Sequence, residues 1–299
     1  MDRMKNQEEY FWDSKLMYLK ESRKYMWNDD YMIFLINYVW KIIEPVNIID
    51  YGCGLGYLGS LMMPLLPKGS TYTGIDKGIK LIEEARETFD KSPFETEFID
   101  EDIFTFIPKK KYDIAICQTL LMHLPNPKEA LKKMIDSVVS GGKIICIELN
   151  WNLSNASLYL NNISTDDIFD YGILAKLWSE ELKRHNTDKC IGNKLPVYMA
   201  ELGLLNIGVR INDSVLFVNP YSDEHEKQLG CFLSDWAHKL GDKTSIIESL
   251  CERGLSKEEA NSQYENELHL HQHIKDNKEE LLAVHAALFF ITYGTNLPN

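Results

Sequence analysis

The sequence has few positive charges for its length. Its 299 residues carry 32 lysines and arginines against 45 aspartates and glutamates, which gives a formal net charge of −13. A nucleic-acid backbone is bound through clusters of basic side chains that displace counterions. The densest basic run, Lys109 to Lys111, lies where a loop is expected. We therefore expect no nucleic-acid partner.

Paired cysteines and long apolar runs are also missing. The six cysteines are scattered without a Cys-x-x-Cys pair, and Cys117 and Cys146 lie inside apolar runs, as small buried thiols do in a reducing compartment. No apolar run approaches the roughly 18 residues that a membrane-spanning helix needs. A basic start followed by an apolar stretch, the pattern of a secretory signal, is not found at the N-terminus. These absences predict a cytoplasmic protein without a membrane partner.

An alternation of strand-like and helix-like segments begins after Pro45. The composition, 44% apolar and 26% charged, is that of a globular protein. The expected strands are 46–50, 71–76, 94–100, 112–118 and 141–149, and the expected helices between them are 57–66, 77–89 and 126–139. Strands and helices in this order predict an α/β fold, with a parallel sheet covered by helices on both faces.

The flanking segments predict further helices. The run 28–43 has helical spacing, with Asn28 as its cap, and Ser256 and Glu259 match a capping box. An aromatic, β-branched run close to the C-terminus predicts a strand. The expected organisation is an N-terminal helical lid (1–44), a cofactor-binding core (45–150), a helical cap over the substrate (151–195), a continuation of the core (196–219), a helical insertion (220–285) and a final core strand with its tail (286–299).

A glycine-rich turn follows the first expected strand, in the stretch "NIIDYGCGLGYLG". Two spacings fit it. Gly54, Gly56 and Gly59 match the dinucleotide fingerprint G-x-G-x-x-G, whereas Asp50 followed by Gly52, Gly54 and Gly56 matches acid-x-G-x-G-x-G. The apolar strand stops at Asp50, so the chain turns before the dinucleotide fingerprint begins. A carboxylate beside this turn repels a pyrophosphate but suits an ammonium group, which favours the second spacing.

Acidic residues also end the next two expected strands. Asp76 is placed to accept hydrogen bonds from ribose hydroxyls. Asp102 and Ile103 follow the third strand, where a carboxylate and a backbone N–H can meet an adenine ring. Nucleoside recognition at three successive strand ends is more specific than any one of these features.

Together these motifs resemble those of class I S-adenosylmethionine-dependent methyltransferases. The resemblance covers Val46 to Leu149, including "YDIAICQTLLMHLPNP" and "SGGKIICIEL", and extends more loosely to "LGLLNIGVR". It implies a Rossmann-like, doubly wound, mostly parallel sheet of seven strands, whose last strand, "LFFITYG", is antiparallel. It also implies S-adenosylmethionine as the cofactor.

The resemblance assigns cofactor contacts residue by residue. It implies Gly52, Gly54 and Gly56 beside the methionine portion, Asp50 near the amino group through the loop or a water, and Asp76 at the ribose hydroxyls. It also implies Asp102 and Ile103 at the adenine and Gln118 near the methionine end, and Lys77 is a further predicted cofactor contact.

Candidate catalytic residues follow the fourth and fifth strands. A methyl group on a sulfonium is already activated, so alignment of the acceptor suffices unless that acceptor must lose a proton. His123 is the candidate base, but a loop histidine packed near the cofactor is the favoured alternative. Glu148 either contacts the substrate or forms an ion pair at the rim of the sheet. His269 and His273 share a helix face but lack further ligands, so no metal site is predicted.

The segment before the first strand mixes basic and aromatic residues. As a lid, it would pair Arg23 with the carboxylate of the cofactor and would line the acceptor pocket with Tyr25 and Trp27. The alternative is ordinary packing of an amphipathic helix on the sheet. Trp151 and further aromatic residues in 152–195 would form the opposite wall, which suggests an apolar or ring-bearing acceptor.

The predicted function is methyl transfer from S-adenosylmethionine to a small-molecule acceptor by in-line displacement. The first alternative is an NAD(P)-dependent oxidoreductase, which the position of Asp50 disfavours. The second is a non-catalytic partner protein that binds S-adenosylmethionine, and the undamaged glycine turn disfavours it. No oligomer is predicted.

Overall fold

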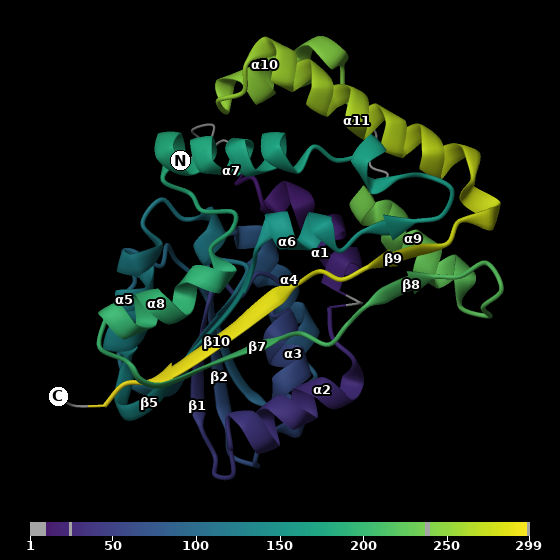
Figure 1. Ribbon diagram of the computed structural model, residues 1–299. Coiled ribbons are helices and arrows are strands. Elements are labelled where there is room, and N and C mark those ends of the chain that lie inside the picture. The colour runs from purple at the N-terminus through teal and green to yellow at the C-terminus, as the bar shows by residue number, and fades with distance from the viewer. Residues whose placement is uncertain (1–9, 24–25, 237–239, 298–299) are drawn as a thin grey trace, which may run out of the picture.

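The centre of the protein is a mixed sheet of seven strands (Figure 1). The computed structural model describes residues 10–23, 26–236 and 240–297. The strands follow the order β3-β2-β1-β4-β5-β10-β7. Their bounds are β1 (Asn47–Tyr51), β2 (Thr71–Asp76), β3 (Glu95–Asp100), β4 (Tyr112–Gln118), β5 (Val138–Leu149), β7 (Leu205–Ile211) and β10 (Phe289–Thr295). Strands β1 to β5 pair in parallel, and β10 runs antiparallel to both β5 and β7. The predicted fold class is confirmed, including the antiparallel strand near the C-terminus.

The middle strands are apolar because helices cover both of their faces. In β1 and β4, residues Ile48, Ile49 and Ile116 are completely buried. In Figure 1, α2 (Asp29–Phe34) and α3 (Tyr57–Met62) lie on one side of the sheet, and α5 (Pro127–Ser137) and α8 (Leu195–Glu201) lie on the other. Helix α4 (Ile79–Phe89) packs on β2 and β3. A two-sided cover of this kind is the usual condition for a parallel sheet.

Two helices differ from their predicted course. The helix expected over 28–43 is α2 followed by a π-helix, η3 (Leu35–Val39). Asn28 lies at the predicted cap position, but its side chain donates to the carboxylate of Asp213 at 2.8 Å and not to the helix. The helix expected over 57–66 is α3 followed by a 3₁₀ turn, η4 (Met63–Leu65), because Pro64 cannot donate to the helical ladder.

A second layer of helices and a small sheet lie beyond the main sheet. The helices are α1 (Leu16–Ser22), α6 (Trp151–Ala156), α7 (Tyr171–His185), α9 (His225–Trp236), α10 (Lys243–Glu252) and α11 (Lys257–Asp276). The small sheet has the order β6-β9-β8, with β6 (Tyr159–Leu160), β9 (Ala283–His285) and β8 (Leu216–Val218). Short 3₁₀ turns complete the described chain: η1 (Asp13–Lys15), η5 (Leu121–His123), η6 (Thr165–Asp167), η7 (Gly192–Lys194) and η8 (Lys278–Glu280). This layer, here called the cap, has an apolar cluster of its own that includes Phe169, Phe232 and Ile274.

Three segments have a different secondary structure or sheet partner from the one predicted. The segment 196–219 was expected to continue the core, but only β7 joins the main sheet, and β8 joins the small one. The segment 220–285 was expected to be helical, but it ends in strand β9. The segment 151–195 contains β6 between its helices. Short strands of two or three residues carry too little alternation to be recognised in a sequence.

Side-chain hydrogen bonds cap the N-terminus of helix α11 and connect the helix to the segment before α7. Ser256 Oγ accepts from the Glu259 N–H at 3.2 Å, and the Glu259 carboxylate accepts from the Ser256 N–H at 2.7 Å, so the predicted capping box is confirmed. His269 and His273 donate to the backbone carbonyls of Asp167 and Asn161. Among the described residues, no cluster of side chains has the composition of a metal site.

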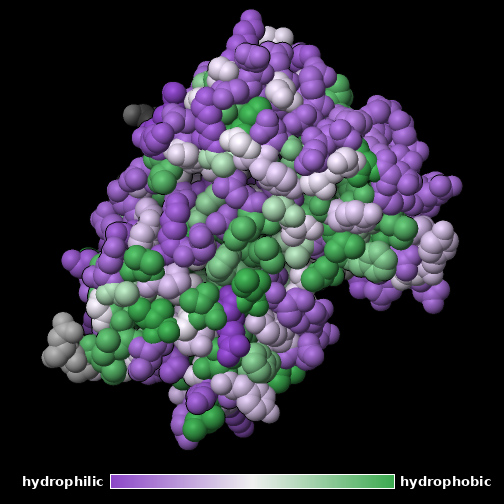
Figure 2. Space-filling view, viewed as in Figure 1, coloured by the Kyte–Doolittle hydropathy of each residue, from purple (hydrophilic) through white to green (hydrophobic). Residues whose placement is uncertain are grey.

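The surface differs between the two parts of the molecule. Figure 2 shows mainly polar residues over α7, α10 and α11, and more apolar residues around β7, β8 and β10. Within the described ranges, no helix is both long and apolar enough to cross a bilayer.

Candidate active site

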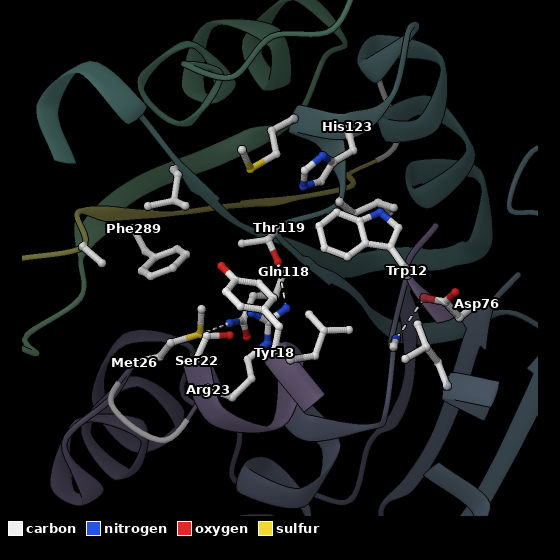
Figure 3. Close-up of a pocket in the computed structure, with 18 of the residues that line it drawn as sticks. Trp12, Tyr18, Ser22, Arg23, Met26, Asp76, Gln118, Thr119, His123 and Phe289 are labelled. Carbon is white, nitrogen blue, oxygen red and sulfur yellow. Dashed lines mark hydrogen bonds between the residues drawn. The ribbon is translucent and has the colours of Figure 1, made fainter. Parts of the chain in front are cut away.

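A cavity of about 630 Å³ lies between the carboxyl ends of the parallel strands and the cap. Its floor follows the strands: Gly52 and Gly54 after β1, Asp76 at the end of β2, Gln118 at the end of β4 with Thr119 after it, and Leu149 at the end of β5. Its roof is formed by α1, α9 and the small sheet, through residues that include Tyr18, Cys231, Leu216 and His285. Figure 3 shows side chains from both parts turned toward one common space. Small-molecule sites commonly enclose about 300–1,000 Å³.

The glycine turn brings bare backbone to this cavity. Gly52 and Gly54 have φ angles of 70° and 55°, a left-handed conformation that glycine adopts without strain. The N–H groups of Gly52 and Cys53 donate to the carbonyl of Ile75, which fixes the turn against β2. Apart from Gly54 and its two chain neighbours, no described atom lies within 4 Å of a Cβ built on Gly54, so a ligand can approach the chain there. Both glycines lie where a cofactor-binding turn requires them.

Gly56 does not share this position. It is not among the described residues that line the cavity, and a Cβ there would lie 3.2 Å from Phe89 and 3.3 Å from Phe98. Its φ of 78° starts helix α3. Gly56 thus has a structural role in the turn, and its predicted contact with the cofactor stays a prediction.

Asp50 is buried beneath the turn. Its Oδ2 accepts from the Tyr72 hydroxyl at 2.5 Å, and its Oδ1 has no hydrogen-bond partner within the described part of the protein. Burial, opposed by the Tyr72 hydrogen bond and assisted by the charge of Asp76, raises the pKa of Asp50 to about 7. Asp50 borders a second cavity of about 30 Å³, together with Gly52, Arg23 and Gln118. That volume is close to the share of one water molecule in the liquid, about 30 Å³.

Three acidic or basic side chains mark the end of the cavity at β2 and β3. Asp76 accepts from the N–H groups of Gly54 at 3.0 Å and Gly78 at 2.8 Å, and burial raises its pKa although these bonds oppose the shift. Lys77 lies 3.8 Å from the carboxylate of Asp102 and 4.9 Å from the centre of the Tyr10 ring. Asp102 and Ile103 line the same end. The structure thus brings together the residues predicted for a nucleoside.

The opposite end of the floor holds Gln118 and Arg23. Gln118 Nε2 lies 2.9 Å from the sulfur of Met26, and the buried Gln118 Oε1 has no partner in the described structure. The guanidinium of Arg23 donates to Thr119 Oγ1 at 3.3 Å, and burial lowers the pKa of Arg23. The unpaired amide oxygen of Gln118, the unpaired carboxylate oxygen of Asp50 and the half-buried guanidinium of Arg23 border one small space, and they fit the ammonium and carboxylate groups of an amino acid.

His123 lines the cavity, but its environment does not suit a proton acceptor. Its Nδ1 lies 3.0 Å from Lys189 Nζ, and its ring meets the Trp12 ring edge-on at 4.9 Å. Burial, with the charges of Lys189 and Arg23, lowers the pKa of His123 to about 3. The ring is therefore neutral near pH 7, and its Nδ1 is in contact with Lys189. Of the two interpretations of His123, the structure favours the packed loop histidine.

Glu148 has a structural position that neither prediction anticipated. It is completely buried and is not among the described residues that line the cavity. Its Oε1 accepts from the N–H groups of Leu120 at 2.9 Å and Leu121 at 2.7 Å, so it holds the turn η5 after β4. Burial outweighs these bonds and raises its pKa to about 7. The carboxylate faces the backbone of η5 and not the cavity, so the structure favours a structural role for Glu148, and its catalytic role stays a prediction.

Of the three residues predicted to contact the substrate, one lines the cavity, one lies in the core and one is outside the described residues. Trp151 lines the cavity and stacks on Trp178, with ring centres 6.3 Å apart. Trp27 is buried but is not one of the described lining residues, and it stacks on Tyr31 at 6.2 Å. Trp27 precedes α2 and packs into the core, so its role in substrate binding stays a prediction that the structure does not favour. Tyr25 lies outside the described residues.

Several lining residues were missed by sequence reasoning. They include Tyr10, Phe11, Trp12, Tyr18, Ser22, Met26, Thr119, Ser154, Cys231, Trp236, His285 and Phe289. His285 Nε2 lies 3.3 Å from Ser154 Oγ, and its ring meets the Trp236 ring at 5.0 Å. The aromatic density of "EYFWDSKLMY" was the one available signal. The other residues meet only through the packing of the cap.

Comparisons with known proteins agree with this geometry. The chain matches the model of a methyltransferase domain over residues 44–196, slightly more than half of its length. It is 31% identical over 108 residues to the ubiquinone biosynthesis O-methyltransferase of Salmonella arizonae, which covers 36% of this chain and 43% of that protein. The Salmonella typhimurium enzyme of the same name gives 30% over the same length. The chain thus spans less than half the length of the curated relatives it matches.

One solved structure shows the fold over most of the chain. It is phosphoethanolamine N-methyltransferase 2 of Haemonchus contortus, solved with phosphomonomethylethanolamine and S-adenosylhomocysteine. The TM-score is 0.52 at 9% identity, and the match covers 96% of this chain and 58% of that one. At this identity the similarity shows the fold alone.

Proposed function

This chain belongs to the methyltransferase domain family, and on that premise we propose that it is an S-adenosylmethionine-dependent enzyme that methylates a small, apolar or ring-bearing acceptor. The observation that carries the proposal is the cavity itself. Its floor presents glycine backbone and nucleoside-type acids, and its roof supplies aromatic rings. A cavity left open between the main sheet and the cap also argues against a non-catalytic partner protein.

The residues of the floor fit the cofactor in two groups. Asp76 and Asp102, with Lys77 and Ile103, would hold its adenosine, because carboxylates at the ends of β2 and β3 can accept from ribose hydroxyls and an amino group. Asp50, Gln118 and Arg23 would hold its amino-acid end, where two buried oxygens lack partners. When bound, S-adenosylmethionine supplies a methyl group activated by a sulfonium charge.

The protein contributes position and exclusion of water. Segments 10–23, 151–195 and 220–285 enclose the cavity, and the lid and cap roles of these segments are part of the proposal. Trp12, Trp151 and Phe289 offer flat apolar surfaces to the acceptor. Alignment of the two reactants in such a site can contribute on the order of 7–11 kcal/mol to catalysis. The acidic net charge disfavours a nucleic-acid acceptor, and a cytoplasmic location stays a prediction.

The test is calorimetric titration of the purified chain with S-adenosylmethionine, S-adenosylhomocysteine and NADH. We expect micromolar binding of the two adenosyl ligands and none of NADH. Asp76→Ala should abolish this binding, because it removes the ribose acceptor and frees the Gly54 N–H. Asp90→Ala, at an exposed position at the end of α4, is the matched control and should bind normally.

Two outcomes would contradict the proposal. Binding of NADH alone would favour the alternative interpretation, in which Gly54, Gly56 and Gly59 form a dinucleotide fingerprint. If the folded chain bound none of the three ligands, a non-enzymatic role would be favoured. Circular dichroism of Asp76→Ala separates loss of the site from loss of the fold.

A further inference from the structure

A lysine outside the cavity contacts the histidine that lines it. Lys189 Nζ lies 3.0 Å from His123 Nδ1, and the two residues are 66 positions apart in the chain. Lys189 is not among the described lining residues, whereas His123 is. The Nδ1 edge of the imidazole is thus turned toward Lys189, and the Nε2 edge remains for the cavity, where Figure 3 shows the ring above Thr119.

The proton of this pair belongs to the lysine. An amine is intrinsically far more basic than an imidazole, with ordinary pKa values of about 10.4 and 6.5. Burial lowers the pKa of Lys189, although the charges of Glu181 and Glu148 oppose the shift. Burial together with the charges of Lys189 and Arg23 lowers the pKa of His123 as well, so the lysine remains the more basic partner. A lysine ammonium has only donors, so His123 Nδ1 must accept. A neutral imidazole with an accepting Nδ1 carries its hydrogen on Nε2.

The charges around His123 favour a negative ligand. The cations that act on it are Lys189, from the loop before η7, and Arg23, which follows α1. The carboxylates among the described lining residues are Asp76 and Asp102 at the nucleoside end and Asp235 on α9. Glu148 lies nearby, but its carboxylate is bonded to the backbone of η5. Asp235 acts on Arg23 and offsets part of its charge, whereas among the described lining residues no carboxylate lies beside the Lys189–His123 pair. His123 therefore offers a donor that is backed by the charge of Lys189.

We propose that Lys189 fixes His123 as an Nε2–H donor for an ionised oxygen, and that the acceptor is a ring-bearing acid such as an aromatic carboxylate. The assignment rests on the proposed methyltransferase function. Methylation of such an oxygen forms an O–C bond and breaks the bond between the methyl carbon and the sulfur of the donor. The electron pair of the broken bond stays on the sulfur. No proton is released, so no general base is needed. His123 then contacts the acceptor, and Lys189 is a positioning residue.

The first test observes the imidazole directly, without an acceptor. The chain is labelled with ¹⁵N-histidine, and the side-chain nitrogens of His123 are identified by their loss in His123→Phe. We expect a protonated Nε2 and a bare Nδ1 that stay unchanged between pH 6 and 8. In Lys189→Met the ring should become a mixture of tautomers, while Lys183→Met, at an exposed position on α7, should leave the spectrum as it was. An Nδ1–H tautomer or an imidazolium at pH 7 in the unsubstituted chain would overturn the proposal.

The second test addresses the class of acceptor. Protein loaded with S-adenosylhomocysteine is titrated with benzoate and with its neutral isostere benzamide. We expect benzoate to bind roughly ten-fold more tightly, the difference between a charge-assisted and a neutral hydrogen bond. The preference should vanish in Lys189→Met, return in part in Lys189→Arg and persist in Lys183→Met.

The outcomes distinguish this inference from the proposed function. Equal binding, a preference for benzamide, or no binding of either probe by a protein that binds S-adenosylhomocysteine would refute the acceptor class. Failure to bind S-adenosylhomocysteine itself would instead refute the proposed function, and the histidine spectrum would still report on the Lys189–His123 pair.

Discussion

Replacing Glu148 with glutamine tests whether this carboxylate serves the fold or the reaction. Burial raises the pKa of Glu148 from 4.5 to about 7, against the opposing effect of the N–H groups of Leu121, Leu120 and Met122. Each pKa unit corresponds to about 1.4 kcal/mol, so ionisation of Glu148 costs the folded state about 3 kcal/mol relative to the unfolded chain. The pKa of Glu148 is higher in the folded state, so protonated Glu148 stabilises the folded state relative to the ionised form. This stabilisation is complete below about pH 4.5 and is lost as the pH rises through about 7.

Glu148→Gln cannot ionise and should lose this dependence on pH. The free energy of unfolding of the variant, relative to the unsubstituted chain, should rise by about 2–3 kcal/mol between pH 5 and pH 8. Asp50 has the same sign of shift but is present in both proteins, so it cancels in the comparison. Urea unfolding at the two pH values measures the difference, and Glu87→Gln, at an exposed position on α4, is the control that should show none.

The result that would refute this reasoning is a stability difference that does not change with pH. Loss of methyl transfer in Glu148→Gln, with an unchanged unfolding curve and normal binding of S-adenosylhomocysteine, would instead restore the catalytic role that the structure argues against.

Three further substitutions test the cofactor turn and the cap. The affinity of the unsubstituted chain for S-adenosylhomocysteine should rise roughly ten-fold from pH 6 to pH 8, because the pKa of Asp50 is about 7 and only its ionised form attracts an ammonium group. Asp50→Asn should remove this rise, and calorimetry that finds the same rise in both proteins would contradict the prediction. Gly59→Ala should destabilise the protein by about 1–2 kcal/mol in thermal unfolding, since its Cβ would lie 2.6 Å from the buried Tyr72 ring and the gain in helix propensity offsets only part of the overpacking; an unchanged melting temperature would show that the ring can move. Ser256→Ala should cost about 1 kcal/mol through loss of the capping box of α11, and equal urea midpoints would argue against it.

The main sheet was predictable because its signals are local. The strands β2 and β4 have the predicted bounds, 71–76 and 112–118, since a short apolar run between turn residues specifies a buried strand without reference to distant residues. The cofactor turn was equally local, and Gly52 and Gly54 follow β1 directly. The antiparallel position of β10, by contrast, came from resemblance to a family and not from the residues of that strand.

The parallel sheet, the left-handed glycine turn and the acids at the ends of β2 and β3 follow from local sequence, because each depends on neighbours a few positions away. The chemistry of the other half of the cavity depends on contacts between distant parts of the chain. The tertiary structure turned Glu148 inward to the backbone, carried Trp27 into the core, and placed Lys189 against His123 across 66 residues. Burial and the charges of distant residues set the protonation state of a side chain, and neither is encoded in its immediate sequence.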